Sequence, residues 1–221
     1  MKYQEFLELL RLKKDEKFAD FSKSISNSDY ISIGVKNPVL REIIKEHTND
    51  EELNLNDFKL GKYLEVDFVY FGLGVCREKT IKEKLKFIKL NIHKAKSWAI
   101  TDMVTTYLLK ITFEDFWDFF IKLHKSQHIY DRRMAYVLGL KLYKDKKILS
   151  VLDYINSDEE YMVMMGEAWL LATIAIVFPD EVYRFLSLTK DATLKRKTIS
   201  KIVDSFRIDE ETKSRFKALR K

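Results

Sequence analysis

Apolar residues recur along this chain at the spacing of one face of an α-helix. In residues 37–47 they stand at positions i, i+1, i+4 and i+5, and Pro38 occupies the first turn. Residues three and four apart share a helix face, and proline is favoured where a helix begins. The pattern predicts an amphipathic helix over residues 37–47.

Similar patterns predict helices along the rest of the chain. They cover residues 56–75, 79–92, 94–110, 112–124, 129–143, 148–156, 159–178, 180–188, 191–205 and 209–220. Thr112 and Asp158 stand where N-caps are expected, and Gly72 and Gly74 should loosen the end of their helix. The chain has only 6 Gly and 2 Pro, which also favours helices over turn-rich sheets.

The predicted helices recur in pairs about every 35–40 residues, a spacing within the range of HEAT-type repeats. Stacked pairs of this kind form a curved α-solenoid with a concave groove. No shift in composition marks a boundary, so the sequence predicts one all-α domain over residues 1–221. A compact, irregular helical bundle is the alternative architecture.

Composition narrows the class of protein. The 221 residues are 46% hydrophobic, enough for a sizeable core. Cys76 is the single cysteine, which excludes an intramolecular disulfide. Residues 1–20 have no apolar signal-peptide core, and the longest apolar stretch, 162–178, contains Glu167 and is too short for a membrane span. We therefore expect a cytoplasmic protein that does not contact membranes.

Positive charge gathers at the C-terminal end. Residues 190–221 contain eleven basic and five acidic residues, which accounts for the whole formal net charge of +6. Lys195, Arg196 and Lys197 form the densest run there. Such an end suits a polyanion such as DNA, and a solvated helix face is the alternative interpretation.

Trp98 and Asp102 are the most informative pair for chemistry. They lie four residues apart, one helical turn, and therefore on the same face. Either residue alone has an ordinary explanation, core packing for the tryptophan and a cap or salt bridge for the aspartate. Arg132 and Arg133 are adjacent and should point about 100° apart, so one of them is expected to be solvated.

One further pair has the spacing of metal ligands. His124 and His128 stand at i and i+4, but no third ligand is evident and no acidic residue lies between them. We expect no metal site.

Five segments together resemble the AlkD-type DNA alkylation repair proteins, which are HEAT-like alkylpurine DNA glycosylases. The resemblance covers the chain from about Ile31 to the C-terminus. The segments are IGVKNPVLR at residues 33–41, WAITD at 98–102, RRMA at 132–135, AW at 168–169, and KTI through SFRI between 197 and 208.

The resemblance implies roles for single residues. It makes Asp102 the catalytic carboxylate, places Trp98 and Trp169 beside the lesion nucleotide, and gives Arg133 a contact to the DNA backbone. It also implies substrates that are cationic N3- and N7-alkylated purines in double-stranded DNA. We add Arg132, Lys195, Arg196 and Lys197 as predicted DNA contacts, and expect a monomer that needs no cofactor.

Physical chemistry is consistent with this hypothesis. A cationic purine leaves without protonation, so one carboxylate suffices to stabilise the positive charge that develops on the sugar. Tryptophan faces attract cations and exclude water. The alternatives are a non-catalytic relative that binds structured DNA or a protein partner through the concave face, and a helical scaffold for proteins.

Overall fold

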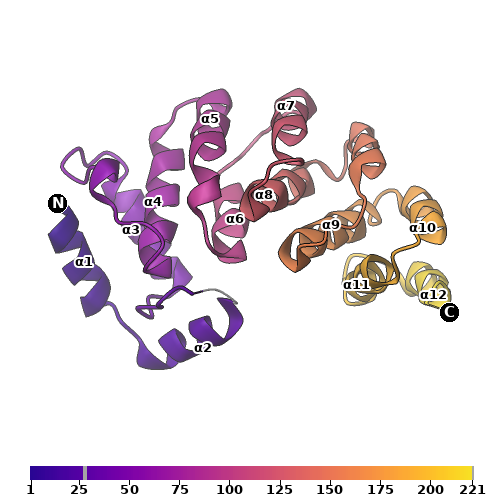
Figure 1. The fold of residues 1–221 in the computed structure, drawn as a ribbon, viewed down its shortest axis with the longest axis horizontal. Helices are drawn as coiled ribbons and strands as arrows, with labels where there is room; N and C mark the ends of the chain where they lie inside the picture. The colour runs from indigo at the N-terminus through magenta and orange to yellow at the C-terminus, as the bar shows by residue number, and fades with distance from the viewer. Residues whose placement is uncertain (27–28, 221) are drawn as a thin grey trace. The chain divides into compact units, whose positions relative to one another are not determined.

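The computed structural model describes residues 1–26 and 29–220, and these residues form α-helices joined by short turns (Figure 1). Contacts divide the chain into two compact units, Met1–Lys110 and Ile111–Lys221. In the described ranges the extended backbone pairs only as an isolated bridge between Ile31 and Tyr63. The predicted fold class, an all-α protein of stacked helices, is confirmed. The single domain over residues 1–221 stays a prediction.

Unit 1 is built around one buried helix. Its α-helices are α1 (Tyr3–Leu12), α2 (Glu16–Ser26), α3 (Asn37–His47), α4 (Leu64–Arg77), α5 (Ile81–Asn91) and α6 (Trp98–Thr105). Two short 3₁₀-helices, η1 (Leu55–Asp57) and η2 (Ile92–Lys94), lie between them. Helix α4 packs against α3, α5 and α6, and every residue from Glu65 to Val75 is buried. A helix that is apolar on nearly all sides belongs in a core.

Two glycines let neighbouring helices approach α4 closely. A Cβ at Gly72 would lie 2.3 Å from Ile44 of α3, and a Cβ at Gly74 would lie 1.9 Å from Phe87 of α5. The prediction that these glycines loosen the end of their helix is wrong, because α4 continues to Arg77.

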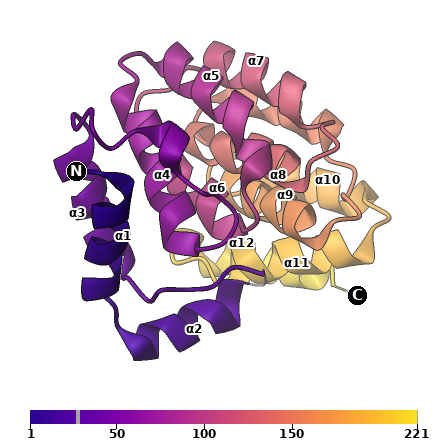
Figure 2. The ribbon, with the colours of Figure 1, turned by 60° about the vertical axis from the view of Figure 1, so that its left-hand side comes forward.

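Unit 2 repeats the same design around α9. Its helices are α7 (Phe113–Leu123), α8 (Ile129–Gly139), η3 (Leu140–Leu142), η4 (Lys146–Tyr154), α9 (Tyr161–Ile174), α10 (Pro179–Leu188), α11 (Ala192–Val203) and α12 (Glu210–Ala218). Helix α9 packs against α8, α10 and α11, and it lies between α8 and α11 in both views (Figures 1 and 2). In the described part of the chain, no helix is both long and apolar enough to cross a membrane.

Two predicted helix starts hold where a proline or a cap sets them, whereas the helix predicted over 159–178 covers Tyr161–Ile174 and ends before Pro179. The helix with Pro38 in its first turn covers residues 37–47 as expected, and Thr112 caps α7 by accepting a hydrogen bond from the Asp115 N–H at 3.2 Å. The helix expected over 56–75 begins only at Leu64, because a turn at Gly61, with φ of +84°, interrupts it. Asp158 is not the cap of α9, which begins at Tyr161.

Candidate nucleic-acid interface

Helix α6 carries Trp98 and Asp102. It begins at Trp98 because the Ser97 hydroxyl accepts a hydrogen bond from a first-turn backbone N–H at 3.2 Å. The Trp98 indole N–H donates to the Ile25 carbonyl at 3.3 Å, which orients the ring toward α2. The Thr101 hydroxyl donates to the Trp98 carbonyl at 2.8 Å and lies 3.1 Å from Asp102 Oδ1. Trp98 and Asp102 are both half-buried.

These two side chains line one cavity of about 260 Å³ in unit 1. The remaining lining residues come from α2, α3, α4 and α6 and are Phe18, Ser22, Ile25, Asn37, Arg41, Leu64, Phe68, Ala99, Met103 and Thr106. Most of them are apolar, so a group that enters is shielded from water on several sides. The volume lies just below the roughly 300–1,000 Å³ of drug-sized ligand sites, and it suits one small group rather than a chain. The predicted common face of Trp98 and Asp102 is present.

Arg41 is a functional candidate that the sequence argument did not single out. Its Nη1 donates to the Thr106 hydroxyl at 3.1 Å, and its guanidinium lies 5.9 Å from the centre of the Tyr107 ring. Asn37 lines the same cavity one helical turn earlier on α3. The i, i+4 spacing of Asn37 and Arg41 is the signal that could have identified them. A guanidinium group in such a cavity is suited to an anionic group such as a phosphate.

The buried carboxylate of Glu65 holds the loop that leads into α3. Its oxygens accept hydrogen bonds from the Ser32 hydroxyl at 2.8 Å and from the backbone N–H groups of Ile33 and Gly34 at 2.9 and 2.8 Å. Gly34 has a φ of +98°, and a Cβ there would lie 2.4 Å from the Asp15 carbonyl oxygen. The glycine of the segment IGVKNPVLR is therefore required by the backbone, and Glu65 holds the loop that leads to the cavity residue Asn37.

A second buried network sets where α6 begins. The Tyr30 hydroxyl donates to Asp67 and accepts from the Lys96 backbone N–H at 3.1 Å. The Gly61 N–H also donates to Asp67, at 3.0 Å. Burial raises the pKa of Asp67 to about 6, and the hydrogen bonds from Tyr30 and Gly61 limit that rise. The network ties the segment before Trp98 to α4.

Arg132 and Arg133 lie on α8 of unit 2, where Arg132 is half-buried and Arg133 is buried, and both are held by protein partners. Arg132 makes a two-pronged ion pair with Asp158, with N···O distances of 2.6 and 3.0 Å, and also donates to the Ser126 carbonyl at 2.8 Å. Arg133 is 5% exposed, and its Nη1 donates to the Met162 carbonyl at 2.6 Å. The expectation that one arginine faces solvent is wrong. Both guanidinium groups contact the start of α9 or the segment before it, and their contacts to DNA stay predictions.

Trp169 lies on α9, half-buried, with the Lys201 ammonium 5.8 Å from its ring centre. Glu167, two residues earlier, is fully buried. Burial raises the pKa of Glu167 to about 7, and the nearby Asp158 carboxylate adds to the rise. Glu167 is therefore part of the interior of unit 2 and does not share the Trp169 surface.

The basic run on α11 faces two directions. Lys195 and Arg196 line a cavity of about 610 Å³, whereas the Lys197 ammonium donates to the Tyr161 hydroxyl at 3.3 Å. The other lining residues of that cavity are Lys190, Ala192, Thr193, Ile199, Ser200, Leu219 and Arg220.

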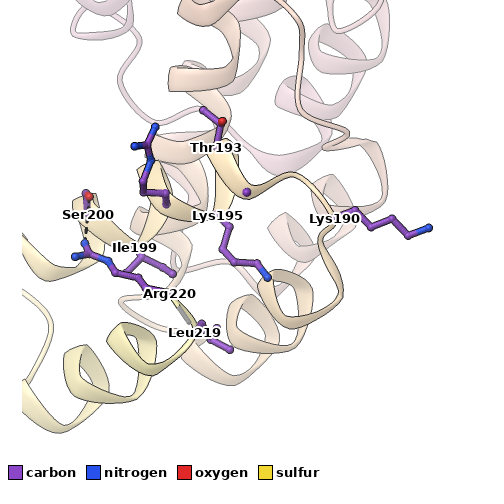
Figure 3. Close-up of a pocket in the computed structure, with 9 residues that line it drawn as sticks. Lys190, Thr193, Lys195, Ile199, Ser200, Leu219 and Arg220 are labelled. Carbon is purple, nitrogen blue, oxygen red and sulfur yellow. Dashed lines mark hydrogen bonds between the residues drawn. The ribbon is translucent and has the colours of Figure 1, made fainter.

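Figure 3 shows how the charged groups of this cavity lie. Arg220 reaches Ser200 and bonds its hydroxyl at 3.2 Å, while the Lys190 side chain extends away from Lys195 and Arg220. Among the residues that the structure describes, the cavity lining includes four cations and no acidic residue. Spread in this way, the cations suit an extended polyanion better than a single phosphate. The sequence did not identify Lys190 and Arg220 as members of one site, because they lie 30 residues apart at the two ends of the C-terminal basic region.

The structure brings together some of the predicted residues. Trp98 and Asp102 share one cavity in unit 1, and Lys195 and Arg196 share another in unit 2. Arg133 and Trp169 lie on the adjacent helices α8 and α9. The resemblance also implies that Trp98, Asp102, Arg133 and Trp169 converge on one concave surface, and this convergence stays a prediction.

Comparison with known proteins identifies the relatives of this chain. A solved structure described as a predicted DNA alkylation repair enzyme from Enterococcus faecalis has the same fold, with a TM-score of 0.69 and 16% identity, over 87% of this chain and 98% of that one. No curated protein sequence matches. The DNA alkylation repair enzyme family matches residues 5–202. Because that match spans most of the sequence, the chain belongs to the family of DNA alkylation repair enzymes.

Proposed function

We propose that this protein is a DNA glycosylase that removes cationic N3- and N7-alkylated purines from double-stranded DNA. Family membership gives the role in repair of alkylated DNA. The observation that supports glycosylase activity is the cavity that Asp102 and Trp98 line together, with Arg41 also in its lining. We further propose that the protein acts as a monomer in the cytoplasm.

The chemistry follows from the charge on the substrate. An alkylated purine is a cation, so the bond between its ring nitrogen and sugar C1′ can break with the electron pair going to the base, which leaves neutral. Positive charge then develops on the sugar, and the Asp102 carboxylate stabilises that charge. A water molecule attacks C1′, its oxygen forms the new bond, and its proton passes to the Asp102 carboxylate and then to solvent, which completes an abasic site. The remaining residues of the mechanism have binding roles.

The aromatic and basic groups position the nucleotide. The Trp98 ring, held by its bond to the Ile25 carbonyl, offers a face that attracts the cationic base and excludes water. Arg41, held by its bond to the Thr106 hydroxyl, is placed for a backbone phosphate. We propose that Trp169, Arg133, Arg132, Lys195, Arg196 and Lys197 make the contacts to DNA in unit 2.

The test is single-turnover release of 7-methylguanine or 3-methyladenine from duplex DNA. Asn has nearly the shape of Asp without the charge, so Asp102→Asn should keep the fold and DNA binding and lose about 10²–10³ in rate. Asp57→Asn, which changes an exposed carboxylate of the same unit, is the matched control and should release base at the wild-type rate.

Two results would contradict the proposal. Equal release by wild type and Asp102→Asn, both above the spontaneous rate, would remove Asp102 from the mechanism. No release by wild type from several cationic lesions would overturn the glycosylase and favour a non-catalytic protein of the same family.

A further inference from the structure

One face of helix α2 forms part of the wall of the cavity around Asp102. Phe18, Ser22 and Ile25 stand at i, i+4 and i+7 of α2 and line that cavity together with Trp98. Phe18 and Ile25 are apolar, so Ser22 is the polar member of this face. Ser22 is 8% exposed, which makes it the most deeply buried polar side chain among the described residues of the lining.

The hydroxyl of Ser22 has no hydrogen-bond partner among the residues that the structure describes. Other hydroxyls nearby are satisfied within their own helices. Ser24 donates to the Phe21 carbonyl at 2.7 Å, and Thr106 after α6 donates to the Met103 carbonyl at 2.7 Å. A buried hydroxyl that bonds to nothing costs free energy. The Ser22 side chain is therefore suited to a polar group that enters the cavity.

Both ends of α2 are fixed, so Ser22 keeps its place in the cavity wall. At the start of the helix, the Asp15 carboxylate accepts a hydrogen bond from the Phe18 N–H at 3.0 Å. At the other end, the Ile25 carbonyl accepts a hydrogen bond from the Trp98 indole N–H. Because Ile25 lies one turn after Ser22, this bond ties the turn that carries the serine to α6.

The burial of Ser22 indicates the size of the group that reaches it. Asn37 and Arg41 are exposed members of the same lining, Asp102 is half-buried, and Ser22 is buried. A nucleotide of duplex DNA stays attached to its strand and must enter from the exposed side. A water molecule occupies only about 30 Å³ and can reach the buried end. The proposed reaction requires such a water beside Asp102.

We propose that the Ser22 hydroxyl and the Asp102 carboxylate together position the water molecule that attacks C1′. One O–H of the water donates to Asp102 and the other donates to Ser22 Oγ, which leaves a lone pair of the water oxygen directed at the sugar. That pair forms the new C1′–O bond, and the proton passes to Asp102, while Ser22 only orients the water. This inference rests on the proposed glycosylase activity and adds a residue of α2 to its site.

The inference makes different predictions for stability and for rate. Ser22→Ala removes a buried hydroxyl without a described protein partner, and alanine is the better helix former, so the variant should unfold at the same or a higher temperature. The same change removes one hydrogen bond to the water, so the rate of base release should fall about 3- to 10-fold. A serine needed only for the fold would instead lose stability together with activity.

The experiment compares wild type, Ser22→Ala and Ser22→Thr in single-turnover release of 7-methylguanine from duplex DNA. Ser22→Thr keeps a hydroxyl and should recover most of the rate that Ser22→Ala loses. Fluorescence anisotropy with the same DNA should give affinities within about 2-fold of wild type for both variants, because the proposed contact is to water rather than to DNA.

Dilute methanol added to the reaction tests the position of the water directly. Methanol has a methyl group in place of one water hydrogen, so it cannot donate to Asp102 and Ser22 at once. The wild-type site should therefore disfavour methanol as the attacking molecule. Ser22→Ala should raise the share of product with a methoxy group at C1′, measured by mass spectrometry, about 3- to 10-fold.

Ser24→Ala is the matched control. Ser24 is an exposed serine of the same helix, and its hydroxyl bonds to the Phe21 carbonyl. Its removal should leave the rate of release, the DNA affinity and the methoxy share unchanged.

Each other outcome has a defined meaning. A wild-type rate or an unchanged methoxy share in Ser22→Ala would overturn this inference and leave the proposed glycosylase intact. Weaker DNA binding by Ser22→Ala would show that the hydroxyl contacts the nucleotide, and a lower unfolding temperature would show a structural role. Either result also overturns the inference. Absence of base release by wild type would overturn this inference and the proposed function together.

Discussion

Replacing Glu65 with glutamine tests whether the loop before α3 depends on a buried carboxylate. Glu65 is 2% exposed, and its two oxygens accept hydrogen bonds from Ser32, Ile33, Gly34 and, at 3.4 Å, Val35. All four partners are donors. The glutamine amide has one oxygen and one NH₂ group, so at least one donor must then face another donor.

The magnitude follows from the number of partners. If the NH₂ group takes the Oε2 position, only the Ile33 N–H loses its acceptor, and a buried donor left unsatisfied costs about 1–3 kcal/mol. The bonds to the remaining oxygen also weaken because their acceptor is no longer charged. We expect Glu65→Gln to lower the free energy of unfolding by about 2–4 kcal/mol, which for a chain of this length lowers Tm by about 4–16 °C.

Thermal unfolding followed by circular dichroism measures this effect. Glu46→Gln, an exposed glutamate on α3, is the control and should change Tm by less than about 2 °C, because surface changes of this kind stay within about 0.5 kcal/mol. A Glu65→Gln protein as stable as the control would show that the carboxylate does not organise the loop. The structural explanation for the segment IGVKNPVLR would then fail.

Two further predictions concern unit 2. Burial raises the pKa of Glu167 from 4.5 to about 7. Between these pH values the folded state binds more protons than the unfolded state. The free energy of unfolding should therefore fall by about 3 kcal/mol as the pH rises from about 4.5 to 7. Glu167→Gln should lose most of this pH dependence in urea unfolding at pH 5 and pH 8, and an unchanged dependence would refute the assignment to Glu167. Because Lys195 and Arg196 line a different cavity from the surface that Lys197 contacts, the double variant Lys195→Ala/Arg196→Ala should weaken binding to continuous duplex and lower its salt slope by about 1.8. An unchanged slope would place the duplex elsewhere on the molecule.

Local signals made most of the helices predictable. Pro38 and the Thr112 cap fixed two helix starts, because each acts on the backbone within one turn. Helix α4 was harder to delimit, since its true start depends on the turn at Gly61 and on a hydrogen bond from Gly61 to Asp67. The apolar pattern continues across that turn, so periodicity alone extends the helix too far.

The candidate site could be predicted only for residues that lie close together in the sequence. Trp98 and Asp102 share a cavity because four residues of one helix place them on one face. The ion pair of Arg132 could not be inferred, because its partner Asp158 is 26 residues away and no short-range spacing links them. Arg41 shares a helix face with Asn37, but its contact with Thr106, 65 residues later, could not be inferred from spacing. Contacts of this range are set by packing between helices.

The two glycines of α4 also constrain how this part of the chain can change in length. Gly72 and Gly74 are two residues apart, so they face directions about 200° apart, one toward Ile44 and the other toward Phe87. Inserting one residue between them would rotate one glycine about the helix axis by about 100° relative to the other. A side chain would then face α3 or α5 at a place where only the hydrogen atom of a glycine fits. Loops of unit 1 can vary in length during evolution, but this turn of α4 must keep its residue count.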